Sequence, residues 1–126
     1  MALNDAIAHL GFKKTIATSA ASTDAAEIDV PVHSFRVTHV TIYNATGNNS
    51  LATLGVFTGA GGTGATIVAN AALTSHTAST VVSESTVAAT ALTPRVTADK
   101  LYIRVGTASG VAGSTVDVII HGYAIP

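Results

Sequence analysis

From residue 27 to the C-terminus, runs of β-branched and aromatic residues alternate with clusters of Gly, Ser and Asn. The turn-forming clusters recur roughly every 8 to 15 residues, a spacing typical of short antiparallel strands. After residue 11, no stretch shows the apolar period of a strong amphipathic helix. We therefore predict an all-β chain, either a jelly roll or a related Greek-key β-sandwich. The expected strands are 27–32, 34–46, 51–58, 65–69, one or two between 79 and 92, 99–107 and 115–125.

The first eleven residues have a different pattern. Leu3, Ile7 and Leu10 recur at helical spacing, and Gly11 can cap the end of a helix. We predict a short helix over residues 1–11. A helix of this length is marginal in isolation, so it is expected to dock on another surface.

Residues 17–26 are small and polar, which is typical of a linker or an extended arm. The predicted organisation is an N-terminal helix and arm over residues 1–26, followed by a β-sandwich domain over residues 27–126.

The stretch GAGGTG, residues 59–64, fits the glycine pattern of a dinucleotide-binding site, and Glu84 follows near the position of a ribose-binding acid. Such a site requires a helix directly after the glycines, with its N-terminus facing the pyrophosphate. Here the glycines lead into Thr- and Val-rich sequence, and no β-α-β pattern occurs. We interpret residues 59–64 as a connection between antiparallel strands, and the position of Glu84 as coincidence.

The charge content restricts the function further. The chain of 126 residues has no cysteine, a net charge of −1 and only 10% charged residues. Cysteine-based metal and redox sites are excluded, and a phosphate-neutralising surface for nucleic acid is not expected. No run of 18 apolar residues suggests a membrane span. Surfaces with so few charges suit a protein packed against copies of itself or a partner, although Thr- and Ser-rich exposed strands are an ordinary alternative.

Five histidines and many serines raise the question of a metal or catalytic site. No two histidines have a spacing that chelates from one strand or helix, but a site built from different strands stays open. No G-x-S-x-G motif occurs, and the acids are few and dispersed. We expect surface or interface histidines, no catalytic residue, no cofactor, no metal and no enzymatic activity. The histidines are His9, His33, His39, His76 and His121.

Two expected strands are apolar on both faces. In 115–125, one face has Val116, Val118 and Ile120, and the other has Ile119, Tyr123 and Ile125 beside Asp117 and His121. In 34–46, strict alternation places Phe35, Val37 and Tyr43 on one face and Val40 and Ile42 on the other. This pattern indicates a second covered surface, although long central strands often carry a few exposed apolar residues.

The segment VTHVTIYNATGNNSLATLGVFTGAGGTGATIVANAALT, followed by DKLYIRVGTASGVAGSTVDVIIHGYAI, resembles small β-rich virion proteins of tailed bacteriophages. The shared features are a strand ending in N-A-[ST]-G, the LGVFTGAGGTG turn, ATIVAN, LYIRVGTA and VDVIIHGY, in this order, over residues 35–125. The resemblance is to capsid decoration (cement) proteins and head-fibre bases. It implies a jelly-roll or other β fold, often trimeric, and no catalytic residues.

We therefore expect a bacteriophage structural protein, made in the host cytoplasm, that binds the outer capsid surface as a homotrimer and bridges major capsid proteins. The alternative is a virion-surface or tail binding module, such as a fibre or a glycan- or receptor-binding domain. No nucleic-acid or membrane partner is expected. The predicted interface residues are Leu3, Ile7, Leu10 and Phe12 in the N-terminal segment, and Tyr43, Tyr102, Arg104 and Tyr123 in the strands.

Overall fold

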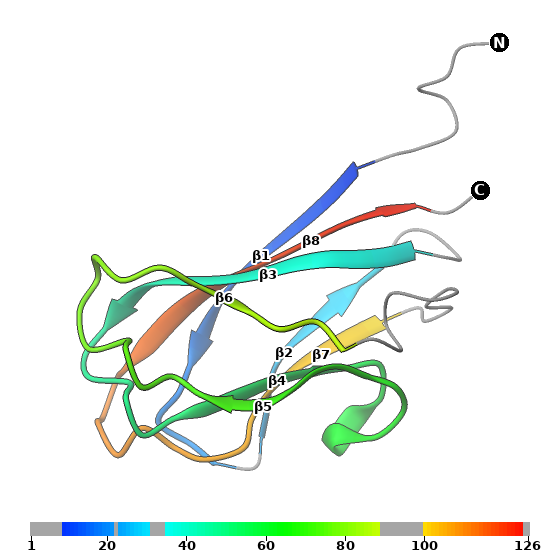
Figure 1. Ribbon diagram of the computed structural model, residues 1–126. Helices are drawn as coiled ribbons and strands as arrows, with labels where there is room; N and C mark the ends of the chain where they lie inside the picture. The colour runs from blue at the N-terminus through cyan, green and yellow to red at the C-terminus, as the bar shows by residue number, and fades with distance from the viewer. Residues whose placement is uncertain (1–8, 22, 31–34, 89–99, 125–126) are drawn as a thin grey trace, which may run out of the picture.

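Two four-stranded antiparallel sheets pack face to face in the computed structural model, which describes residues 9–21, 23–30, 35–88 and 100–124 (Figure 1). The first, the β8 sheet, has the order β1-β8-β3-β6, and the second, the β7 sheet, has the order β2-β7-β4-β5. The predicted all-β sandwich is confirmed. The strands are β1 (His9–Ala17), β2 (Thr23–Asp29), β3 (Phe35–Thr46), β4 (Thr53–Phe57), β5 (Thr66–Ala72), β6 (Ser83–Ser85), β7 (Lys100–Val105) and β8 (Thr115–Ala124).

The pairing is largely between segments far apart in the sequence. β1 pairs with β8, β2 with β7, β3 with β6 and β4 with β5, and the β3–β8 and β4–β7 pairs complete the sheets. Each sheet therefore contains strands from both halves of the chain. Neither sheet can form before most of the chain is available.

The space between the sheets is filled by β-branched and aliphatic side chains that alternate with outward residues. Val116, Val118 and Ile120 of β8 are at most 1% exposed, as are Leu101, Ile103 and Val105 of β7. Burying one such side chain contributes about 1.5–3 kcal/mol. The alternation seen in the sequence thus supplies the core that holds the sheets together.

The glycine run lies between β4 and β5, which pair antiparallel, and it contains a short 3-10 turn, η2 (Ala60–Gly62). The predicted connection between antiparallel strands is confirmed. Gly61, Gly62 and Gly64 all have φ between 69° and 77°, a region that favours glycine. Glu84 lies in β6, in the other sheet.

The N-terminal prediction is wrong for the residues that the structure describes. Residues 9–11 begin β1, which pairs with β8 from His9↔Tyr123 to Ala17↔Thr115. Ile16 is fully buried in the core and Phe12 packs against it. Pairing along β8 and core burial override the local helical spacing, as tertiary context often does. Residues 1–8, with Leu3 and Ile7, lie outside the described residues.

The expected boundary at residue 26 is not found either. β2 begins at Thr23 and pairs with β7, and Ala25 and Ala26 pack against the core. The described part of residues 1–26 therefore contributes a strand to one sheet and the start of a strand to the other. The small side chains that suggested a linker instead fit an edge strand.

The face assignment for 34–46 is also wrong, because β3 contains a bulge. The register shifts between Val37 and His39, so that Thr38 is an extra residue opposite β8. The extra residue reverses the alternation, and Phe35, Val37, Val40 and Ile42 all face the core with at most 3% exposure. Tyr43 faces outward. The bulge removes most of the two-faced apolarity of this strand.

Gly122 of β8 lies opposite the bulge. A Cβ at this position would overlap the carbonyl oxygen of Arg36 and lie 3.2 Å from the Cα of Val37. Both atoms belong to the β3 backbone, which cannot move without breaking the sheet. The position therefore requires glycine for space.

Gly122→Ala is expected to destabilise the fold by about 1–3 kcal/mol, the usual cost of overpacking. Gly11→Ala is the matched control, because a Cβ there would meet only the Nδ1 of His121, at 3.9 Å. The measurement is urea unfolding of both variants and the wild type. Equal midpoints for the two variants would show that the bulge tolerates a methyl group.

Candidate interaction surfaces

The outer face of the β8 sheet presents side chains in rows that cross three strands. The register of β1 with β8 and of β8 with β3 fixes which residues share a row. Ile119 and Tyr43 are half-buried on this face. From β1 through β8 to β3, the rows are Gly11–His121–His39, Lys13–Ile119–Thr41 and Thr15–Asp117–Tyr43.

Asp117 is the centre of this face and is only 5% exposed. Its carboxylate accepts hydrogen bonds from the Thr15 hydroxyl at 2.6 Å and from the Asn44 side-chain amide at 2.9 Å. These two bonds, in this order, hold the pKa of Asp117 below its usual value against the opposing effect of burial. The carboxylate is ionised at neutral pH and ties β1 and β3 to β8.

Lys13 covers Asp117 from β1. Its Nζ lies 3.9 Å from the Asp117 carboxylate and 5.7 Å from the centre of the Tyr43 ring. The interaction with Tyr43, followed by the attraction of Asp117, raises the pKa of Lys13. The ionised carboxylate, its two hydrogen bonds and the nearby lysine therefore hold the three strands β1, β8 and β3 together.

The outer face of the β7 sheet is organised by ion pairs. Arg104 contacts Asp24 at 3.3 Å, and the other oxygen of Asp24 accepts the Gly61 amide at 2.9 Å. Asp24 thus holds the glycine turn against the sheet and also neutralises Arg104. Lys100 pairs in the same way with Glu27, at 2.5 Å, and with Asp29, at 3.3 Å.

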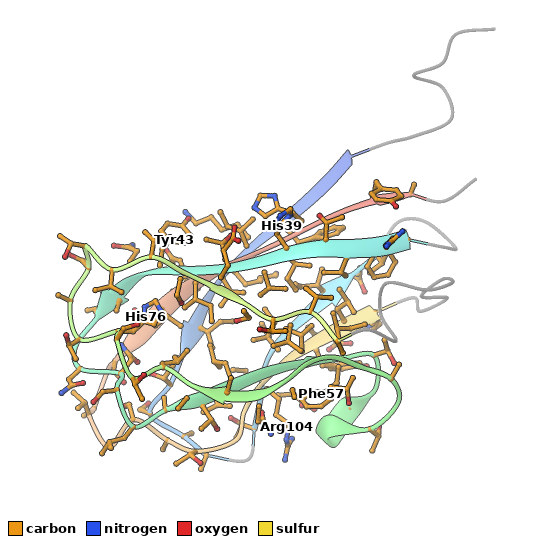
Figure 2. The ribbon with its side chains drawn as sticks, viewed as in Figure 1. His39, Tyr43, Phe57, His76 and Arg104 are labelled. Atoms are coloured by element: carbon orange, nitrogen blue, oxygen red, sulfur yellow. The ribbon has the colours of Figure 1, made fainter. Side chains whose placement is uncertain are left out.

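The predicted interface residues do not form one patch. Tyr43 and Tyr123 lie on the outer face of the β8 sheet, whereas Tyr102 and Arg104 lie on the outer face of the β7 sheet. Figure 2 shows Tyr43 and Arg104 on opposite sides of the sandwich. Phe12 packs against the core of its own chain, and Leu10 lies in β1. One neighbouring molecule cannot contact all four strand residues at a single flat interface, and their role in contacts stays a prediction.

A third surface is the end of the sandwich where four connections meet (Figure 1). We call it the loop end. None of its residues is Asp, Glu, Lys or Arg. Its exposed apolar side chains are Leu51 at 69%, Val82 at 65% and Val111 at 37%. The loop end comprises residues 18–21, 47–52, 73–82 and 106–114.

Backbone hydrogen bonds join these four loops to one another. The Ser109 amide donates to the Thr18 carbonyl at 2.8 Å, and the Asn49 amide donates to the His76 carbonyl at 2.9 Å. The Leu73 amide donates to the Ala52 carbonyl at 2.9 Å. Each loop is therefore held by at least one other loop, which limits their motion.

Beneath the loop end lies a buried network of polar side chains. The Asn49 amide group is fully buried and donates to the carbonyl oxygens of Thr46, Gly47 and Thr115 at 3.1–3.3 Å. Its oxygen accepts a bond from the Thr18 hydroxyl, which also contacts Ser114 Oγ at 2.8 Å. Ser109 extends the chain of hydroxyls from Ser114. The side chains in this network are uncharged amides and hydroxyls, and their hydrogen bonds fix the loops to one another.

His76 is buried in the same region, at 1% exposure. Its Nε2 lies 2.6 Å from the Ser83 hydroxyl, and its Nδ1 has no hydrogen-bond partner among the described residues. Burial lowers the pKa of His76. A neutral imidazole thus fastens the β5–β6 loop to β6, and sequence reasoning gave no sign that this histidine was internal.

His39 and His121, in contrast, are exposed and adjacent. They are register partners on β3 and β8, and their ring centres are 6.5 Å apart with an angle of 82° between the ring planes. Sequence spacing could not reveal this pair, because the strands are separated by most of the chain. Within the described ranges, no cluster of three or more His, Cys, Asp or Glu side chains could hold a metal.

Comparison with known proteins adds no relative. A scan against family models, a search of curated proteins and a search of solved structures found no match to this chain. In the part of the chain that the structure describes, no helix is long and apolar enough to cross a membrane.

Asn49→Ala is expected to lower the free energy of unfolding by about 3 kcal/mol, because three carbonyls and a hydroxyl lose a buried partner. The control is the neighbouring variant Asn48→Ala. Asn48 is exposed and accepts only the Ser50 amide, at 2.9 Å, so its loss is expected to cost about 1 kcal/mol or less. Chemical denaturation measures both. Equal losses would mean that the buried network does not hold the loops.

His76 is expected to make stability depend on pH. Its pKa is lowered on folding, so the unfolded chain binds the proton more readily, and the stability present above pH ~6.5 is lost as the pH falls below that value. Unfolding curves between pH 7.5 and 5 should therefore diverge for the wild type and His76→Gln, which cannot titrate. The other histidines are common to both proteins. Parallel curves would contradict the assignment.

Proposed function

We propose that this chain is a structural protein of a tailed-bacteriophage virion, and that it decorates the capsid by binding the outer surface of the major capsid protein. The observation that carries the proposal is the loop end, which is uncharged, exposes Leu51, Val82 and Val111 and is cross-linked by hydrogen bonds. The resemblance of residues 35–125 to virion proteins supplies the identity of the partner.

The composition of the loop end suits protein–protein contact. The cores of protein interfaces are depleted of charged residues, because burying an unpaired charge is costly. Loops that are already ordered lose little conformational entropy on binding. A surface of Gly, Ala, Ser, Thr and Asn with a few aliphatic side chains can therefore dock on a flat neighbour without desolvating charges.

The strand order supports the jelly-roll part of the proposal. In an eight-stranded jelly roll, the first strand pairs with the last, the second with the seventh, the third with the sixth and the fourth with the fifth. The present orders β1-β8-β3-β6 and β2-β7-β4-β5 contain these pairs. Jelly rolls are common among viral capsid proteins. The same fold hosts lectins, so this part of the support is analogy.

Many copies acting together would stabilise the shell even if each contact were modest. We propose a homotrimer on the capsid exterior, which would present three loop ends to the shell at once. A virion-surface or tail binding module with the same fold would be present in few copies. Quantitative mass spectrometry of purified particles distinguishes the two, because decoration requires a fixed ratio to the major capsid protein.

The contact surface is tested with two matched variants. Ala112→Lys places a charge on the loop end, and Ala60→Lys places the same charge in the exposed η2 turn. Ala112→Lys is expected to weaken binding to shells lacking the protein at least ~10-fold, because an unpaired charge would be desolvated. Ala60→Lys should bind as the wild type does.

Shell occupancy after sedimentation measures both variants, with thermal unfolding to confirm that they are folded. Wild-type binding by Ala112→Lys would overturn the loop end as the contact surface. Absence of the chain from particles would overturn the virion role itself.

A further inference from the structure

The bulge in β3 turns His39 toward the outer face of the β8 sheet. Under strict alternation, residue 39 would share the inward face of Phe35 and Val37. The extra residue Thr38 instead places His39 beside His121, and both side chains are exposed. Bulges often re-aim a side chain at a functional position.

The hydrogen bonds around Thr38 fix which nitrogen of His39 carries the proton. The Thr38 hydroxyl donates its one hydrogen to the backbone carbonyl of His121 at 3.2 Å. It must therefore accept at its 3.1 Å contact with Nδ1 of His39, so Nδ1 is protonated. The Nε2 atom of His39 is left with its lone pair. Metal-ligating histidines typically donate the N–H of their other ring nitrogen to a partner that sets the tautomer in this way.

The separation of the two rings suits a shared ion. A metal bound to an imidazole nitrogen at about 2.0–2.1 Å lies roughly 3.2 Å from the ring centre. Two such rings at a tetrahedral angle have centres roughly 5 Å apart, and at a linear angle roughly 6.4 Å apart. The observed 6.5 Å is close to the linear value, and a tetrahedral site requires rotation about the side-chain bonds of the two exposed residues to bring the rings roughly 1.5 Å closer.

Gly11 is the third residue in the row of His39 and His121, and the space beside it leaves room for the ion's other ligands. Gly11 is the β1 partner of His121 and has no side chain, and a Cβ there would be 3.9 Å from His121 Nδ1. The rows on either side contain the cations Lys13 and Arg36, and the row of Lys13 and Thr41 ends on β6 in the exposed carboxylate of Glu84. Imidazole ligands favour Zn²⁺, Ni²⁺ or Cu²⁺ over Mg²⁺ or Ca²⁺.

We propose that His39 and His121 form a two-histidine site for a first-row transition-metal ion of the Zn²⁺, Ni²⁺ and Cu²⁺ class on the outer face of the β8 sheet. Thr38 is a positioning residue that sets the tautomer of His39. Water fills the remaining coordination positions in the isolated protein. A ligand from a molecule docked on this face could replace that water, and the site itself does not depend on the virion role.

The site is tested with the full chain by Zn²⁺ titration in a calorimeter. His39→Gln and His121→Gln are each expected to weaken Zn²⁺ binding at least ~10-fold, and Thr38→Val by ~10-fold through loss of the supporting bond. Asp29→Asn, an exposed change on β2 of the other sheet, should leave the affinity unchanged. Equal affinity in the wild type and in both histidine variants would overturn the site.

Nuclear magnetic resonance locates the ion independently of affinity. Substoichiometric Ni²⁺ should broaden the imidazole signals of His39 and His121 first, while the signals of buried His76 stay sharp. Broadening confined to His9 or His33 would place the ion elsewhere and overturn the proposal. Thermal unfolding of each variant in metal-free buffer separates loss of a ligand from loss of the fold.

Discussion

The pairing of β8 with both β1 and β3 is the constraint on which the rest of the structure depends. β8 is the last strand of the chain, yet it lies between the first and third strands of its sheet. Its inward residues fill the core, and its outward Asp117 bonds to both neighbours. The three-stranded unit therefore forms only after the C-terminus is available, and such long-range contacts make folding slow relative to helical proteins.

This dependence explains why the sequence predicts the all-β fold correctly but predicts a helix where the N-terminal strand β1 lies. The sequences around Ile42, Ile103 and Val118 predict strands, because they are rich in β-branched residues and alternate between apolar and polar positions. Both are local signals. The N-terminal segment carries an ambiguous signal, since Phe12 and Ile16 are compatible with a helix or with one face of a strand. Only the presence of β8 as a partner decides between them, and a partner more than 90 residues away is invisible to local reasoning.

The candidate sites were harder to predict for the same reason. The bulge at Thr38 is an alignment between two strands, so neither strand shows it alone, yet it decides which way Val40, Tyr43 and His39 point. The low content of charged residues indicates a weakly charged surface, but composition alone does not show which part of the surface has no charges. The structure places most described charges in pairs on the sheets and leaves the loop end without any.

The loop end and the outer face of the β8 sheet differ in how their backbone groups find hydrogen-bond partners. At the loop end, irregular backbone must find hydrogen-bond partners without regular pairing, and buried Asn49, Thr18 and Ser114 supply them from uncharged groups. Because amides and hydroxyls of this kind do not titrate near neutral pH, these hydrogen bonds do not depend on pH there. On the outer face of the β8 sheet, the backbone groups already bond to neighbouring strands. The side chains there are not needed to satisfy the backbone, so they can contact ions or neighbouring molecules. The chain thus separates an uncharged end, which exposes a few aliphatic side chains, from a sheet face that carries ionisable groups.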